Sequence, residues 1–446
     1  MNKIKSSILL LCSVAFVANS AQADGSAAVF RVNPDSLRTQ LLVNNISVKE
    51  SLNSLYQAKD QLNISRAKLL PSVNLGVVMS PTFLLSQVSF LLPFLFPSNW
   101  FNMRQSKDVL NATTAAYGLV QLNQYASTYA IYETTVNDFG LRDVLQKQYD
   151  ALNKIYNVLY QESVLNGNVS QKDLLQAQSQ AFMAQIQLDS VDKLIGQEKA
   201  ALRSLLAISD STDIQFDLVH VPESVDEAVV SGDALQKLVD HALSIAPEST
   251  QIDWLISASK DAKWSAAFGW LSGSTLGTSS AGSGATTASF NKFIQSNTIS
   301  LGFSLFPSIH LASDNVAEMI LQKEALRLQE NQIIEGSINS IAEAKQQVLL
   351  SVNAEKNMSQ VYEMESQKYA LGLTDLLHVL TAETQVTAAS QARVQSQTDL
   401  DNLRINLHRA LLTDQFTKVQ GCQLQSFSRW HSAVSLDQAC NPNAPK

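Results

Sequence analysis

The sequence predicts a mainly α-helical chain built from two tandem repeats, each with two β-strands followed by two long helices. Three observations support this fold class. Glycine and proline contribute only 16 and 10 of the 446 residues, so residues that interrupt helices are few. One short motif occurs twice, 210 residues apart, and each copy opens a long run without proline. An alternating, strand-like stretch precedes each copy.

The first 23 residues are predicted to form a secretory signal peptide. Two lysines precede an apolar run over residues 8–17, and Ala21-Gln22-Ala23 supplies the small residues of a cleavage site. The apolar run is too short to span a bilayer. Cys12 follows the bulky Leu11, whereas a lipoprotein signal needs a small residue there. We therefore expect an ordinary secretory signal.

The repeated motif sets the domain plan. Phe94-Leu95-Phe96-Pro97-Ser98 resembles Ser304-Leu305-Phe306-Pro307-Ser308, and near the middle of each following run lies a glycine, Gly167 or Gly372. Two ordered matches at nearly the same offset indicate a duplication. The predicted plan is a first repeat over residues 24–208, an intermediate segment over 209–246, a second repeat over 247–414 and a polar C-terminal tail over 415–446.

Strands are predicted within about 71–97 and about 266–306. Near the end of the second stretch Leu301, Phe303 and Leu305 alternate with Ser300, Gly302 and Ser304. Segments of about ten residues suit a tilted crossing of an outer membrane, with apolar side chains toward lipid. We expect the lipid-facing set to be Val73, Leu75, Leu301, Phe303 and Leu305. The aromatic residues Trp100, Phe101, Trp264 and Trp270 form either an interfacial girdle or part of a core. Four strands cannot close a barrel alone, so the chain should oligomerise.

Helical hairpins are predicted over about 100–208 and about 312–413. In the second, a heptad stripe includes Ile334, Ile341 and Val348 and extends to Tyr369, with Glu355 interrupting it. One interpretation is a coiled-coil hairpin that turns at the glycine. The other is a helical wall one layer thick, which the many uncharged polar residues favour. Periodicity alone does not separate the two.

Between and after the repeats lie segments of different character. Residues 210–227 are acidic and contain an alternating stretch over 214–218, and a short helix is expected over 234–245. The tail carries Cys422 and Cys440, the two cysteines left after signal cleavage. Because secreted proteins meet an oxidising compartment, we expect a disulfide between them. The alternative is two free thiols on a disordered tail.

Several function classes are excluded by composition and motif. The net charge is −8 and basic residues do not cluster, so a nucleic-acid partner is not expected. No phosphate-binding glycine loop, zinc-protease helix or serine nucleophile elbow occurs. The six histidines show no metal-ligand spacing, and the pairs Asp138/Asp143 and Asp399/Asp401 do not share a helix face. We expect no enzyme activity, no metal and no cofactor.

Together these features resemble the outer-membrane efflux protein family, the TolC-like channels, over nearly the whole mature chain. The first helix ends in Ala67-Lys68-Leu69-Leu70-Pro71 and the second repeat opens with Ala246-Pro247-Glu248, both similar to family elements. Tyr369-Ala370-Leu371-Gly372 with Val379-Leu380-Thr381-Ala382 resembles the second tip of the family. Where some relatives carry acidic residues after this tip, the sequence has His378 and Thr381.

The resemblance implies a homotrimer in which four strands per chain form a 12-stranded β-barrel over a long α-helical periplasmic tunnel. It also implies outer-membrane lipid around the barrel, docking to a periplasmic adaptor protein and an inner-membrane transporter, and passive export of drugs or polypeptides (multidrug efflux or type I secretion). A rival interpretation is a periplasmic coiled-coil scaffold that does not insert in the membrane.

The resemblance also assigns candidate site residues. The adaptor-contact tips would be Gly167, Asn168, Val169 and Ser170 in the first repeat and Gly372, Leu373, Thr374 and Asp375 in the second. The gate candidates are Asp173 and Tyr369. A simpler interpretation is that each glycine supplies the positive φ of a turn and that Tyr369 is ordinary heptad packing. The two interpretations of the glycines are compatible.

Overall fold

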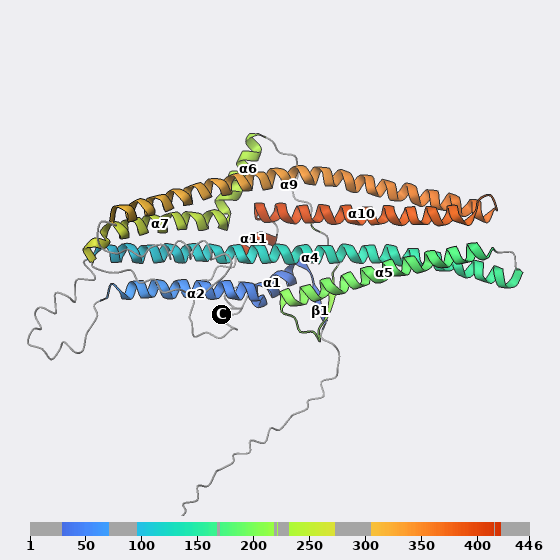
Figure 1. Ribbon diagram of the computed structural model, residues 1–446, viewed down its shortest axis with the longest axis horizontal. Coiled ribbons are helices and arrows are strands. Elements are labelled where there is room, and N and C mark those ends of the chain that lie inside the picture. The colour runs from blue at the N-terminus through green and yellow to red at the C-terminus, as the bar shows by residue number, and fades with distance from the viewer. Residues whose placement is uncertain are drawn as a thin grey trace, which may run out of the picture.

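The computed structural model describes residues 29–70, 96–166, 170–217, 221, 232–272, 305–413 and 415–420. In this part of the chain the long helices lie side by side in one layer (Figure 1). At one end the order across the layer is α2, α4, α7, α9, and at the other end it is α5, α4, α10, α9. The second interpretation of the heptad pattern, a wall one helix thick, is therefore confirmed.

Two helices run the full length of the layer. They are α4 (Pro97–Asn166, 70 residues) and α9 (Leu305–Ala370, 66 residues). At 1.5 Å per residue each is about 100 Å long. Pro97 is the first residue of α4 and Pro307 the third of α9, positions in the first turn where a missing N–H costs no helical hydrogen bond. The repeated proline motif thus predicted both helix starts.

Two shorter helices complete the end of the layer from which the predicted strand segments depart. They are α2 (Ile46–Ala67), which packs on α4, and α7 (Pro247–Ser272), which packs between α4 and α9. Ser65 and Ser106 hydroxyls lie 2.7 Å apart between α2 and α4, and the Ser265 hydroxyl donates to Asn102 Oδ1 at 2.6 Å between α7 and α4.

The prediction of strands over 266–306 is wrong at both ends. Residues 266–272 continue α7, and Leu305 and Phe306 begin α9. The physical reason lies in the aromatic residues. Trp264 and Phe268 are one helical turn apart, and both stack on Phe101 of α4, with ring centroids 6.4 and 5.8 Å from that ring. This contact requires the helical spacing and makes these residues part of the α4–α7 packing. Leu305 begins α9, so the prediction that it is a lipid-facing strand residue is wrong.

The other end of the layer is made by two hairpins. α5 (Gln171–Leu206) returns along α4, and α10 (Leu376–Leu411) returns between α4 and α9. The stripe residues Ile334, Ile338 and Ile341 are buried against α10 and α6, as the heptad pattern predicts. Tyr369, at the far end of the stripe, is exposed instead.

A belt of small elements lies beside the middle of the layer. It consists of β1 (Val29–Val32), α1 (Pro34–Asn44), β2 (Asp213–Phe216), α6 (Asp233–Ile245) and α11 (Gln415–Gln420). β1 and β2 pair in parallel, with Val29 opposite Asp213. The strand-like stretch and the short helix expected between the repeats are confirmed as β2 and α6.

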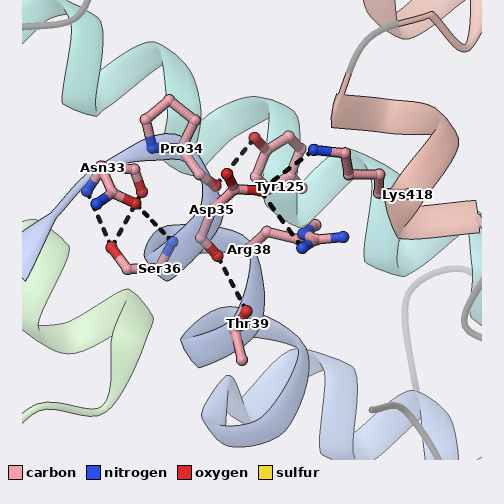
Figure 2. Close-up of polar contacts among 8 residues, drawn as sticks. All are labelled: Asn33, Pro34, Asp35, Ser36, Arg38, Thr39, Tyr125 and Lys418. Atoms are coloured by element: carbon pink, nitrogen blue, oxygen red, sulfur yellow. Dashed lines mark hydrogen bonds and ion pairs between the residues drawn. The ribbon is translucent and has the colours of Figure 1, made fainter. Parts of the chain in front are cut away.

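Capping fixes the belt to the long helices at the start of α1. Asn33 and Ser36 form a reciprocal capping box, in which the Ser36 N–H donates to Asn33 Oδ1 at 2.8 Å (Figure 2). In the same view Lys418 of α11 pairs with Asp35 at 3.4 Å, and the Tyr125 hydroxyl of α4 donates to the Pro34 carbonyl at 3.4 Å. Three elements distant in sequence therefore meet at one helix N-terminus.

The duplication is visible in the backbone. Ala207 after α5 and Leu412 after α10 both adopt the left-handed conformation, with φ of 49° and 52°, and they lie at the 205-residue offset of the two glycines. Asn45 and Ala246, which separate α1 from α2 and α6 from α7, also share φ and ψ within a few degrees. The two repeats thus agree in local geometry as well as in sequence.

Several predictions lie outside the described residues. They are the signal peptide over 1–23, the strand segments over 71–95 and 273–304, the tip residues Gly167, Asn168 and Val169, and the disulfide between Cys422 and Cys440. None of the described helices is both long and apolar enough to cross a membrane.

Candidate functional site: the hairpin tips and the buried carboxyl groups

The second tip is a glycine turn between α9 and α10. Gly372 has φ of +69°, and the Leu373 N–H donates to the Lys368 carbonyl at 2.8 Å across it, which closes the last turn of α9. A Cβ on Gly372 would meet no atom within 4 Å, so the turn needs glycine for its backbone angle and not for space. Asp375 then caps α10, because its carboxylate accepts from the His378 N–H.

The first tip ends with a similar cap. Ser170 precedes α5, and its hydroxyl oxygen accepts from the Lys172 N–H at 3.2 Å. Asp173 follows in the first turn of α5, where a negative charge favours the helix dipole. The predicted tip residues that the structure describes, Ser170 and Gly372 to Asp375, therefore lie in or next to helix caps.

Both tips carry apolar side chains that face solvent. Leu165, Leu371 and Leu373 are 79%, 74% and 73% exposed, and Val164 is also exposed. Behind them, Leu376 and Leu380 of α10 pack against Leu152 and Leu159 of α4, which holds the two tips together. Exposed leucines gathered at one end of a molecule are typical of a contact surface for another protein.

The two gate candidates lie near one another although they come from different hairpins. Partial burial raises the pKa of the Tyr369 hydroxyl, and the carboxylates of Glu162 and Asp173 raise it further. The tyrosine of the second tip thus lies near two acidic side chains that flank the first tip, Glu162 at the end of α4 and Asp173 at the start of α5. The pair is therefore placed where a contact between hairpins would restrain the tips.

The polar interruption of the heptad stripe has partners on α10. Glu355 accepts hydrogen bonds from the Ser390 hydroxyl and from Arg393 Nε, each at 2.6 Å. Closer to the tip, burial raises the pKa of Glu383 on α10, and the same carboxyl group helps to raise the pKa of Tyr362 on α9. The half of the α9–α10 seam that approaches the tip is thus polar, whereas the half near the belt is apolar.

A second group of carboxyls is buried where α4 meets α5 and α10. Glu133 and Asp401 are 1% and 0% exposed. Burial, followed by the charge of Asp401, raises the pKa of Glu133 to about 8. Next to them, burial and the neighbouring Asp138 raise the pKa of Glu198 to about 7, and burial raises the pKa of Asp138. Glu133 and Glu198 therefore ionise closer to neutral pH than an exposed glutamate does.

The sequence analysis did not identify Glu133, Glu198 or Glu383 as carboxyl groups whose pKa is raised by burial. A signal was present for two of them. Glu133 follows Tyr129 by four residues, on the stripe of buried tyrosines, and Glu383 follows Val379 by four on the buried face of α10. A charged residue on an apolar helix stripe is the pattern that would have found them. Within the described residues no group of three or more His, Cys, Asp and Glu side chains is placed to hold a metal ion.

Comparison with known proteins identifies solved structures that share this fold. No protein-family model matches the sequence, and no curated protein matches it. Solved structures do match. The CmeC outer membrane channel of Campylobacter jejuni is 16% identical, with 92% of this chain and 89% of that chain covered and a TM-score of 0.64.

Two further structures agree. The outer membrane protein VceC of Vibrio cholerae is 15% identical, with 85% and 95% of the two chains covered and a TM-score of 0.62. The open state of the MtrE outer membrane channel of Neisseria gonorrhoeae is 14% identical, with 85% and 88% covered and a TM-score of 0.61. The chain therefore has the fold of these outer-membrane channels, the TolC-like fold that the sequence predicts.

Proposed function

We propose that the chain is one protomer of a trimeric duct in the outer membrane, with its helical layer in the periplasm. The duct is passive and gated, and it conducts cargo for an export system that also has a periplasmic adaptor and an inner-membrane transporter. The fold shared with CmeC, VceC and MtrE supports this role. Four strands per chain would close a 12-stranded barrel, with the strands drawn from the segments over 71–95 and 273–304.

The observation that carries the proposal is that two helices at the edges of the layer, α5 and α9, are apolar on two opposite faces. In α5 the buried residues Ala177, Ala184 and Leu188 lie against α4. Leu175, Phe182 and Ile186 are exposed and lie within about 40° of one another on the opposite face. A helix at the edge of a finished protein would be polar there.

The same holds for α9 at the other edge. Leu321, Leu328 and Leu350 are exposed on the face roughly opposite to the buried Ile334 and Ile341. If α9 of one copy packs on the next copy, with Leu321 and Leu328 toward α2 and Leu350 toward α5, these apolar faces are covered and the layer curves into a closed ring. A ring of such layers encloses a tunnel, as cyclic assemblies with head-to-tail interfaces do.

The tips supply the docking end of this duct. Leu371 and Leu373 with Leu165 give the adaptor an apolar surface, and the turn at Gly372 sets the shape of that surface. Asp173 and Tyr369 lie just behind and restrain the tips, so we assign them to the gate.

Membrane extraction and single-channel recording test this function. The full chain should stay in the outer-membrane pellet after high salt and alkali and be released by detergent, and the purified trimer should conduct in planar bilayers. Conductance should rise in a Tyr369→Ala/Asp173→Ala double variant that is still trimeric. Release by alkali would support the non-inserting scaffold instead, and unchanged conductance in the double variant would remove the gating role.

The cargo is tested separately in cells. Loss of the gene should make cells sensitive to toxic small molecules if the duct serves efflux. It should remove a polypeptide from the culture medium if the duct serves type I secretion.

A further inference from the structure

The seam between α4 and α10 is the place where the first repeat contacts the second within one protomer. On α4, Glu133 and Asn137 are one helical turn apart and face the same side. Asn137 Nδ2 donates to Asp401 Oδ2 of α10 at 3.2 Å. All three side chains are buried. Two carboxyl groups therefore face one another in the interior, on helices that belong to different hairpins.

Asp401 is equipped to carry a charge and Glu133 is not. Besides Asn137, Gln397 donates to Asp401 Oδ1 at 2.9 Å, and Arg404 Nη1 lies 3.9 Å from the same oxygen. Donors of this kind stabilise a buried carboxylate. Glu133 has the charge of Asp401 on one side and Tyr129, whose hydroxyl favours the anion, on its own helix. Two facing anions in a buried seam repel, so the favoured state holds one proton on Glu133.

The charged and titratable groups around the pair come from three helices. They are Tyr129 and Asp138 on α4, Glu198 on α5, and Asp401, Arg404 and His408 on α10. Among these groups Arg404 is the permanent cation, and it already lies beside Asp401. When Glu133 ionises, this set of side chains therefore gains a negative charge that none of its own permanent cations newly balances.

We propose that Glu133 and Asp401 form a proton-dependent clamp that holds the two hairpins of a protomer together when Glu133 is protonated and loosens when it ionises. Glu133 favours its protonated form in the closed seam, so closure is stabilised at low pH. The stabilisation is full below about pH 4.5, where an exposed glutamate is also protonated, and is lost as pH rises through about 8. A role of the clamp in opening the export duct rests on the proposed function. The pH-dependent contact between α4 and α10 does not depend on that function.

Hydrogen–deuterium exchange of the intact trimer in detergent tests the clamp. The reporter is α10 over residues 394–411, and the variant Glu133→Gln lies on α4. The reporter peptides therefore have the same sequence in both proteins, and the pH dependence of the exchange chemistry cancels in the ratio of wild-type to variant rates. Between pH 6 and pH 9 this ratio should rise on the order of 10- to 100-fold.

Three further variants assign the pH response to the facing pair. Glu343→Gln, at an exposed position of α9, should leave the pH dependence of wild type unchanged. Asp401→Asn should weaken the dependence without abolishing it, because burial of Glu133 remains. Glu198→Gln should retain the α10 response. A flat ratio for Glu133→Gln across this pH range, or a response lost in Glu198→Gln, would overturn the proposal. Conductance of the same proteins in planar bilayers then shows whether loosening of the α4–α10 seam opens the duct. If the proteins do not conduct but the pH dependence of hydrogen exchange is as expected, the proposed function is contradicted and the clamp is not.

Discussion

Individual backbone positions decide where the long helices turn. Gly372 holds a positive φ with open space around it, while Ala207 and Leu412 adopt the same region with side chains. For a residue with a Cβ the left-handed region costs roughly 1–2 kcal/mol. The chain therefore tolerates this strain where a helix enters the belt, but uses glycine at the exposed tip, where few contacts offset the cost.

Gly372→Ala should destabilise the protein by about 1 kcal/mol, because alanine is strained at φ of +69°. Gly336→Ala is the matched control. Gly336 lies inside α9, and a Cβ there also meets no atom within 4 Å, so alanine should stabilise by about 0.5–1 kcal/mol. Chemical denaturation of both variants measures the difference. Equal effects of the two substitutions would show that the turn angle is not what glycine provides.

At the scale of elements, the seam between α9 and α10 combines an apolar half with a polar half. Ile334, Ile338 and Ile341 form the apolar half, and Glu355 with Ser390 and Arg393 begins the polar one. Polar residues at core positions of paired helices commonly fix the register at some cost in stability. The interruption that weakened the heptad pattern thus has a structural role.

Glu355→Ala should destabilise the protein by about 1–2 kcal/mol, because it removes two hydrogen bonds to a charged group that is only partly exposed. Asp143→Ala removes the exposed pair with Lys147, which has an N–O distance of 2.6 Å, and should change stability by less than about 0.5 kcal/mol. Thermal unfolding of the two variants compares them. A similar loss of stability in both variants would mean that the contacts of Glu355 with Ser390 and Arg393 contribute no more than a surface ion pair.

The elements differ in how well the sequence predicted them. Pro97 and Pro307 located both helix starts, because a missing N–H restricts proline to the first turn. The end of α7 was misplaced, because Trp264 and Phe268 suit a strand by propensity but bind Phe101 at helical spacing. Within the candidate site, the turn at Gly372 could be predicted from the local sequence. The Glu133–Asp401 pair did not, because it joins residues 268 positions apart through tertiary packing.

At the scale of the whole molecule, one layer of helices has no core of the usual kind. Its buried clusters lie along the seams between neighbouring helices and, in one case, between the belt and α4, and the outer faces of α5 and α9 are apolar. In the proposed duct, other copies of the chain cover those faces.

Phe182→Glu should abolish trimers, because it places a charge on the apolar outer face of α5 that the next copy would bury. Gln185→Glu adds the same charge at an exposed polar position one turn away and should leave trimers intact. Native mass spectrometry in detergent gives the number of chains. A trimer that survives in Phe182→Glu would show that α5 is not at the interface between copies.

The two apolar edges also have a consequence before assembly. α4 with α5, and α9 with α10, are hairpins of adjacent sequence, and such local pairs form quickly in a folding chain. If the chain assembles as proposed, a newly made chain forms its hairpins early and then carries the exposed apolar faces of α5 and α9 until it meets other copies. Exposed apolar faces of this kind make a chain prone to aggregate before it assembles. If the chain assembles as proposed, a chaperone that covers these apolar faces before assembly should raise the yield of correctly assembled protein.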